Sequence, residues 1–364
     1  PDETAPNLHQ MKPLSAPEYL EELIARAERA GASDVHLQMT NGGAQIAFRL
    51  DGLLTNASTV ERELAERLFG RIKFLAHLKT YQESLPQDGR IDKADIKGKS
   101  DIRVSTYPTV TGEKIVLRLF ADQSVPKLEE LEMPDAASAE LKKFLRQSAG
   151  MLLLTGPAGS GKTTTIYACL RELSQSGGRH IITIEDPVER ILPGIMQTEI
   201  NEARGLTFAA AARHLLRQDP QVLVIGEIRD DETANLAIRA ALTGHLVIST
   251  LHAGSCKGVF ERLFVMCPDK YAVISSVELV LNQRLIRRLC QHCAGKGCRE
   301  CLDTGYHGRL PVVEFVKIDD KLRAALRGES SISINPIPTL RESAGHLCER
   351  DQTNANEVSR VFGE

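Results

Sequence analysis

The sequence contains no tryptophan, and aromatic residues make up only 4% of its 364 residues. Proteins that bind single-stranded nucleic acid often stack the bases on aromatic side chains, and this composition offers few of them. Basic residues are not in excess either, because the formal net charge is −3. A dedicated nucleic-acid binder more often has a basic surplus. The composition therefore argues against nucleic acid as the partner, although a local basic patch is compatible with it.

Long apolar runs are also missing. No stretch approaches the roughly 18 consecutive apolar residues of a transmembrane helix, and no signal peptide is visible. We therefore expect any membrane association to be peripheral, from the cytoplasmic side and through partner proteins. Residues 1–16 are mostly polar and contain prolines, and residue 1 is not a methionine, which indicates a linker or an expression remnant. Met11 is the alternative native start.

Two different patterns divide the rest of the chain. Residues 17–120 combine an amphipathic helix with alternating strand patterns, which predicts a small α+β domain. Residues 121–138 contain prolines and several acidic side chains, which predicts a linker. In residues 139–302, helices alternate with continuous apolar strands, as is typical of a mostly parallel α/β sheet covered on both faces. Residues 303–364 are polar and predicted to be a helical C-terminal part.

The most specific motif is GPAGSGKT, which fits the pattern G-x-x-x-x-G-K-[ST]. It follows the apolar run MLLLT and precedes an amphipathic helix, so that backbone N–H groups and the helix dipole can hold phosphates. Lys162 can reach the β- and γ-phosphates, and Thr163 can ligate Mg²⁺. A chance glycine-rich turn is the alternative. The residues predicted to bind ATP are Gly156, Pro157, Ala158, Gly159, Ser160, Gly161, Lys162, Thr163 and Thr164.

Acidic residues follow two further apolar strands. Glu227 comes after QVLVIG, and Glu185, Asp186 and Glu189 come after or at the end of HIITI. Ligands of open α/β sheets bind at the carboxyl ends of the strands. We therefore predict that Glu227 ligates Mg²⁺ or accepts a proton from the attacking water, and that Glu185 has a metal-binding or water-positioning role. The alternatives are a solvated rim charge and a charged turn.

In TGHLVISTLH, one histidine precedes a predicted strand and another follows it. His252 follows a strand that we expect beside the phosphate-loop strand, so it is predicted to sense the γ-phosphate. His245 precedes that strand and is the weaker candidate. A single histidine is more often a structural hydrogen bonder, which is the alternative for both.

In this order, GPAGSGKTT, ITIEDPVE, QVLVIGEIRD and TGHLVISTLHA resemble the Walker A, Asp, Walker B and His boxes of the secretion and type IV pilus assembly ATPase superfamily. Segments such as ASDVHLQ and DIRVSTYPT are similar to the PAS-like N-terminal domain of that family. The resemblance implies a RecA-like ATPase domain in a homo-hexamer. It also implies inner-membrane platform proteins as partners, at the cytoplasmic face of the inner membrane.

The resemblance extends to basic residues. It implies that Arg103 and Arg118, in the N-terminal domain, reach the phosphates when the domains close, and solvated strand arginines are the alternative. Arg213 and Arg217 are weaker candidates, and Arg229 is expected to pair locally. Gln221 replaces an aspartate of the family, at the end of the strand away from Glu227, so we expect no effect on catalysis. The additional N-terminal docking domain usual in secretion and pilus-extension members is absent from this sequence, so it was removed or this is a short variant.

Four of the eight cysteines lie close together, in the pattern C-x₂-C-x₄-C-x₂-C. Paired C-x₂-C units in a cytoplasmic protein suit tetrahedral coordination of a structural Zn²⁺, and the intervening glycines permit a sharp turn. Four reduced thiols are the alternative. The predicted zinc ligands are Cys290, Cys293, Cys298 and Cys301.

The predicted fold class is α/β: a RecA-like P-loop NTPase domain, preceded by the α+β PAS-like domain, with a small tetracysteine insertion. Retraction motors of the superfamily lack the tetracysteine loop, so the resemblance favours a motor that couples ATP hydrolysis to assembly of a secretion pseudopilus or a type IV pilus. The alternatives are a retraction or DNA-uptake motor of the same superfamily, a RecA-like nucleic-acid translocase, and a relative that binds nucleotide without hydrolysing it.

Overall fold

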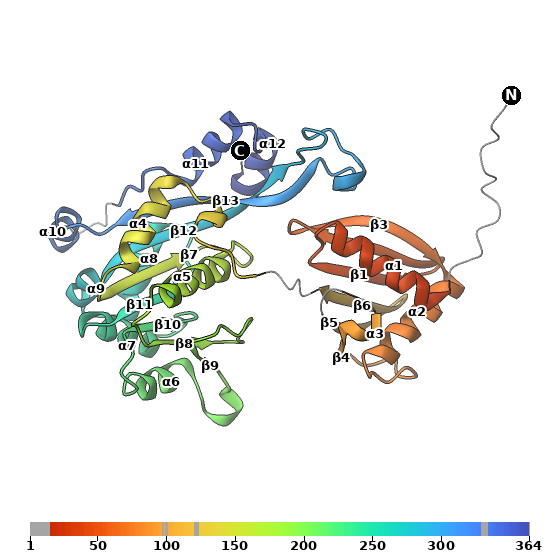
Figure 1. Ribbon diagram of the computed structural model, residues 1–364, viewed down its shortest axis with the longest axis horizontal. Helices are drawn as coiled ribbons and strands as arrows, with labels where there is room; N and C mark the ends of the chain where they lie inside the picture. The colour runs from red at the N-terminus through yellow and green to blue at the C-terminus, as the bar shows by residue number, and fades with distance from the viewer. Residues whose placement is uncertain (1–14, 97, 99–100, 120–123, 329–333, 364) are drawn as a thin grey trace. The chain divides into compact units, whose positions relative to one another are not determined.

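The computed structural model describes residues 15–96, 98, 101–119, 124–328 and 334–363. Most of the predicted leading segment lies outside these residues. The chain forms two compact units, drawn in Figure 1. The first unit holds the described residues of Pro1–Gln123 and Leu289–Gly308, and the second those of Ser124–Arg288 and Arg309–Glu364. Among the described residues, no helix is both long and apolar enough to cross a membrane.

The first unit is built on a six-stranded antiparallel sheet in the order β3-β2-β1-β6-β5-β4. Helices α1 and α2 pack on one face of it, where Leu23, Phe48, Leu68 and Ile115 form part of a buried core. The helices and strands of this part are α1 Ala16–Arg29, β1 Asp34–Thr40, β2 Gly43–Leu50, β3 Leu53–Glu61, α2 Arg62–Leu75, β4 Gln87–Ile91, α3 Lys93–Ile96, β5 Ile102–Thr109 and β6 Gly112–Leu119.

A tight turn separates β2 from β3 in the first unit. The chain turns at Asp51 and Gly52, whose φ angles are 49° and 89°. Two consecutive residues with positive φ form the tight turn that joins antiparallel strands, and Asp-Gly is a preferred pair for it. The turn signal was therefore present in the sequence. The likeness of this unit to a PAS-like domain stays a prediction.

The second unit contains a seven-stranded sheet in the order β13-β12-β7-β11-β10-β8-β9. From β12 to β9 in this order, each strand runs parallel to the next. The elements of this part are α4 Asp135–Leu145, β7 Gly150–Thr155, α5 Lys162–Ser176, β8 Ile181–Glu185, β9 Met196–Glu199, α6 Phe208–Leu215, β10 Val222–Ile225, α7 Asp231–Leu242, β11 Leu246–Leu251, α8 Cys256–Met266, α9 Lys270–Ser276, β12 Val277–Leu289, β13 Tyr306–Lys317, α10 Asp320–Gly328, α11 Leu340–Glu349 and α12 Ala355–Phe362.

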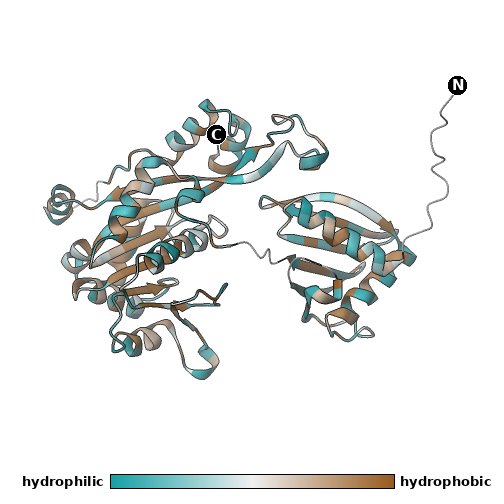
Figure 2. Cartoon of the chain, in the orientation of Figure 1, coloured by the Kyte–Doolittle hydropathy of each residue, from teal (hydrophilic) through white to brown (hydrophobic). Residues whose placement is uncertain are grey.

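Both faces of this sheet are buried, as the continuous apolar strands predict. Met151 and Leu153 of β7 pack with residues of α6, α7, α8 and α9, whereas Leu152 and Leu154 pack on the other face with residues of α4 and α5. The hydropathy colouring shows the same strands as predominantly hydrophobic (Figure 2). The predicted α/β class is confirmed.

The prediction of a purely helical segment after residue 302 is wrong for its first part, because Tyr306–Lys317 is strand β13. Pro311 obscures the strand pattern, since a proline cannot donate to a sheet hydrogen bond. It is tolerated because β13 lies at the edge of the sheet. The helical part begins with α10. Strand β12 was also not predicted.

Candidate functional site

The glycine-rich loop lies between the end of β7 and the start of α5. Its glycines have positive φ angles, which are 138° at Gly156, 73° at Gly159 and 89° at Gly161. A Cβ atom at Gly156 would lie 2.3 Å from the backbone oxygen of Gln283 in β12, so no side chain fits there. The sequence therefore folds this segment into a tight loop whose amide groups surround the N-terminus of a helix, which is the geometry that binds phosphate.

Lys162 is the first residue of α5, and its side chain folds back over the loop. Its Nζ donates hydrogen bonds to the carbonyl oxygens of Gly156 and Pro157, both at 2.9 Å. Burial and the nearby charge of Arg284 lower the pKa of Lys162, and Glu227 acts in the opposite direction. Ser160 is buried, and its Oγ has no hydrogen-bond partner among the described residues.

Glu227 lies two residues beyond the end of β10, and His252 lies directly after β11. The structure brings them together, because Nε2 of His252 is 3.7 Å from Oε2 of Glu227. Arg229 pairs with Glu227, and at 3.4 Å with Asp186, so it pairs locally as expected. Because β10 and β11 are parallel neighbours, their carboxyl ends place Glu227 and His252 on the same sheet edge.

Glu185 is the last residue of β8 and is only 8% exposed. Its carboxylate accepts hydrogen bonds from the hydroxyls of Tyr167 and Thr183, both at 2.5 Å, and from Nε2 of Gln197 at 3.0 Å. Burial and the Glu185 carboxylate raise the pKa of Tyr167. Sequence reasoning missed Tyr167 and Gln197. Their contacts show that Glu185 is held rigidly by the fold.

A cavity of 190 Å³ lies at the carboxyl edge of the sheet, and Glu185, Glu227 and His252 all line it. Glu189 also lines it, and burial together with the Glu185 carboxylate raises the pKa of Glu189. Sequence reasoning did not foresee Phe208 and Thr250, which complete parts of the wall. The sequence-predicted residues that line the cavity are Lys162, Thr163, Glu185, Asp186, Glu189, Glu227 and His252.

The remaining candidates lie away from this cavity. His245 precedes β11, and its Nδ1 is 2.9 Å from the carbonyl oxygen of Ala240. Gln221 precedes β10, at the end of the strand away from Glu227, and accepts a hydrogen bond from the His180 amide at 2.6 Å. Arg213 pairs with Glu232. These contacts stabilise the fold and involve no residue that lines the cavity.

Arg103 and Arg118 are in the first unit, where they are directly opposite each other on the antiparallel strands β5 and β6. Opposite residues share one face of a sheet, so both guanidinium groups lie on the same side. Nε of Arg118 donates to Oδ1 of Asp34 at 3.0 Å, and the Arg118 side chain is 64% exposed. Their approach to the phosphates of a nucleotide stays a prediction.

The four cysteines form a compact cluster whose sulfur atoms all lie within 4.8 Å of one another. The separation is 3.9 Å for Cys290–Cys298, 3.8 Å for Cys293–Cys301 and 3.7 Å for Cys298–Cys301. Four sulfurs bound tetrahedrally to Zn²⁺ at about 2.3 Å would be about 3.8 Å apart. Amides of Cys298 and Gly305 also donate to the Cys301 sulfur, which stabilises a thiolate. The residues present therefore fit a structural zinc ion.

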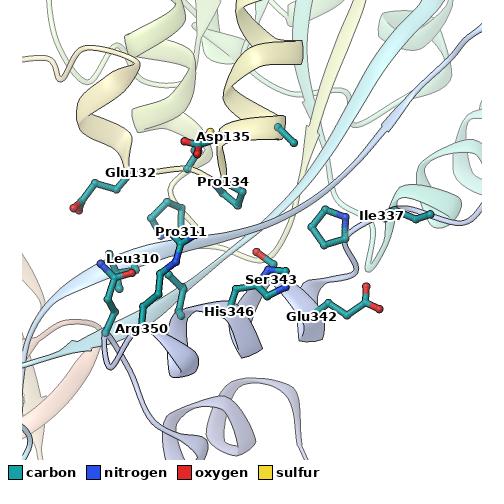
Figure 3. Close-up of a pocket in the computed structure, with 15 residues that line it drawn as sticks. Glu132, Pro134, Asp135, Leu310, Pro311, Ile337, Glu342, Ser343, His346 and Arg350 are labelled. Atoms are coloured by element: carbon teal, nitrogen blue, oxygen red, sulfur yellow. The ribbon is translucent and has the colours of Figure 1, made fainter.

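A larger cavity of 720 Å³ lies elsewhere in the second unit (Figure 3). It is bounded by the residues around the start of α4, by Leu310 and Pro311 of β13, and by Ser343 and His346 of α11. It contains none of the residues predicted from the sequence to bind nucleotide or metal. The larger cavity is therefore separate from the candidate catalytic site.

Comparisons with known proteins agree with these features. The family model described as type II/IV secretion system protein matches residues 10–360. The chain is 44% identical over 355 residues to the type II secretion system protein HxcR of Pseudomonas aeruginosa, which covers 93% of this chain and 76% of that protein. It is 40% identical over 370 residues to the type II secretion system protein E of Klebsiella pneumoniae, with 93% and 74% covered. It is also similar to the type IV pilus assembly ATPase PilB of Thermus thermophilus, at 35% identity over 392 residues, covering 98% of this chain and 44% of PilB.

Solved structures give the same fold. The pilus retraction motor PilT with bound ADP superimposes with a TM-score of 0.61 and 26% identity, covering 94% of this chain and 92% of PilT. The ATPase DotB of Legionella pneumophila superimposes with a TM-score of 0.74 and 20% identity, covering 98% of each chain, and supports the fold alone.

Proposed function

Because the chain belongs to the type II/IV secretion system protein family and is a secretion or pilus assembly ATPase, we propose that it drives assembly of a type II secretion pseudopilus or a type IV pilus. The observation that carries the proposed site is the meeting of Lys162, Thr163, Glu185, Glu227 and His252 around one cavity. They come from four different strand ends of one parallel sheet, where such folds bind ligands.

Each side chain has a distinct part in hydrolysis of ATP. The loop amides and Lys162 hold the phosphates, and Thr163 offers its hydroxyl to Mg²⁺, which offsets charge on the transferred phosphoryl group when bound. Glu227 accepts a proton from the attacking water, and in this proposal His252, whose Nε2 is 3.7 Å from Oε2 of Glu227, senses the γ-phosphate. Glu185 is held by three hydrogen bonds in the wall of the site, where its proposed role is to position a water or to bind the metal.

We propose that coupling of ATP hydrolysis to movement requires the first unit. In this proposal Arg103 and Arg118 close on the nucleotide, where guanidinium groups offset the charge that develops during phosphoryl transfer. The chain acts as a homo-hexamer at the cytoplasmic face of the inner membrane. Closure in successive subunits moves inner-membrane platform proteins, and nucleic acid has no part. The resemblance and the exposed cross-strand arginine pair support this arrangement.

The tetracysteine cluster has a structural role in this proposal. Zn²⁺ would be held by the four thiolates with no open position for a substrate, and it would fix the short turn between the two C-x₂-C units. Metal analysis of the purified chain is expected to find one zinc per chain. A metal-free protein that is folded and active would contradict this.

The experiment that tests the proposed site is the Glu227→Gln variant. It removes the proton acceptor but keeps the size of the side chain, so ATPase turnover is expected to fall about 100-fold or more while ATP affinity changes little. Glu261→Gln is a matched control, because Glu261 is an exposed residue of α8 that pairs with Lys257. It is expected to leave turnover unchanged.

A Glu227→Gln protein with full ATPase turnover would overturn the assignment. In cells, the same variant is expected to abolish pilus assembly or secretion. An excess of pili would instead identify a retraction motor.

A further inference from the structure

Strand β12 approaches the glycine-rich loop from the side opposite to the catalytic carboxylate. The sheet order is β12-β7-β11-β10, and β12 pairs with β7 in parallel, with Asn282 opposite Thr155. Glu227 and His252 follow β10 and β11, on the other side of β7. The end of β12 therefore lies on the side of β7 away from Glu227 and His252.

The end of β12 is in direct contact with the loop. The backbone oxygen of Gln283 limits the space at Gly156. The side-chain Nε2 of Gln283 would lie 2.7 Å from a Cβ atom at Gly161. Thr165 of α5 also donates to Oε1 of Gln283 at 2.9 Å. Arg284 is the next residue of β12. Because successive side chains of a strand point to opposite faces, Arg284 does not share the position of Gln283 against α5.

Arg284 is half-buried, and its Nη1 atom is buried without a hydrogen-bond partner in the part of the chain that the structure describes. A buried, unpaired guanidinium nitrogen costs free energy unless a ligand satisfies it. Burial lowers the pKa of Arg284, and the charge of Arg284 in turn contributes to the lowered pKa of Lys162. Arg284 directly follows Gln283, which contacts the loop, so β12 brings a second cation near the loop that Lys162 covers.

The charge of Glu314 acts to raise the pKa of Arg284, but this carboxylate already has other partners. Oε1 of Glu314 accepts a hydrogen bond from the Cys256 amide at 3.2 Å and another from Nδ2 of Asn282 at 2.9 Å. Among the described residues, no carboxylate lies within ion-pair distance of Arg284 or Lys162. An anion at the loop would satisfy both cations.

We propose that Arg284 donates hydrogen bonds to the α- or β-phosphate of the bound nucleotide, from the side of the loop opposite to Glu227. The proposal rests on nucleotide binding by the loop and adds a residue from β12 to it. ATP and ADP share these phosphates, so the contact binds both nucleotides alike. Such uniform binding affects affinity and leaves the rate of the chemical step unchanged.

The test is the Arg284→Gln variant of the full chain, with dissociation constants for ATP and ADP measured alongside KM and kcat. Loss of a charged hydrogen bond is expected to weaken ATP and ADP binding about 10-fold or more, by the same factor for each. The value of kcat at saturating ATP is expected to stay within about 2-fold. Arg288→Gln is the control from the same strand, because Arg288 pairs with Glu132, and wild-type affinity is expected for it.

Thermal unfolding of each variant shows whether it is folded. If Arg284→Gln does not fold, Arg284→Lys carries the test, since it keeps the charge but loses the guanidinium fork; weaker binding of both nucleotides with unchanged kcat is expected. A folded variant with wild-type affinity for ADP and ATP, or one that loses kcat and keeps its affinity, would overturn the inference. A wild-type chain that binds neither nucleotide would overturn the proposed site itself.

Discussion

Two lysines, one in each unit, show how differently the same side chain is used. Lys73 of α2 is 1% exposed, and its Nζ donates to both carboxylate oxygens of Glu113, at 3.0 and 2.9 Å, and to the carbonyl oxygen of Gln82 at 2.9 Å. An ammonium group has three donors, so Lys73 is fully satisfied and its charge is neutralised. Among the described residues, the partners of the Lys162 ammonium group are two carbonyl oxygens of its own loop. It keeps a donor and its charge for a ligand.

The contrast does not follow the division into units, because the second unit also contains a charged group whose hydrogen-bonding partners are all protein groups. We call such a cluster completed, and one that lacks a partner incomplete. Glu357 of α12 is fully buried and accepts hydrogen bonds from Arg287 at 2.7–2.9 Å and from Arg360 at 2.6 and 2.7 Å. Glu227, by comparison, faces the cavity. A completed cluster holds the fold together, whereas an incomplete one is where a substrate supplies the missing partner.

Exchanging each lysine for methionine tests this comparison with the largest expected effects. Lys73→Met leaves Glu113 buried without its partner, so the free energy of unfolding of the first unit is expected to fall by about 3–5 kcal/mol. Lys162→Met is expected to change stability by less than about 1 kcal/mol and to lower ATPase turnover about 100-fold or more. Urea unfolding and steady-state ATPase measurements distinguish the two outcomes.

The double variant Lys73→Met, Glu113→Leu is the control. It replaces both charges with apolar groups, so most of the lost stability is expected to return. Equal destabilisation by Lys73→Met and Lys162→Met would remove the distinction between the two lysines.

A smaller, pH-dependent effect is expected at Glu357. Burial alone would raise its pKa, but the hydrogen bonds from Arg360 and Arg287 outweigh it and lower the pKa to about 2. A carboxyl group with a lowered pKa stabilises the fold above its ordinary pKa, and this contribution is lost as the pH falls toward 2. Unfolding measured between pH 5 and about 2 is expected to show a loss of up to about 3 kcal/mol from this group.

Glu357→Gln should remove most of that pH dependence, because the amide does not titrate in this range. A variant that retains the wild-type acid sensitivity would show that another carboxyl group is responsible.

The parts of the site that could be predicted from the sequence are local. The loop from Gly156 to Thr163 is defined by consecutive residues, and Glu227 and His252 follow apolar strands whose parallel order fixes where their ends meet. The parts of the site that sequence reasoning missed depend on contacts between residues that are far apart in the chain. Gln283 packs on a loop more than a hundred positions earlier in the chain, and Tyr167 finds Glu185 only when α5 lies on the sheet. Neither pairing leaves a periodic pattern or a spacing that could be recognised.

The edges of the seven-stranded sheet bear on how the protein associates with copies of itself. At one edge, Pro311 interrupts the row of amide donors in β13, and at the other, β9 comprises only Met196–Glu199. Short edge strands and edge prolines discourage the addition of strands from another chain. Open-ended growth by sheet extension is thus disfavoured, which is compatible with the proposed ring, whose contacts close on themselves through other surfaces.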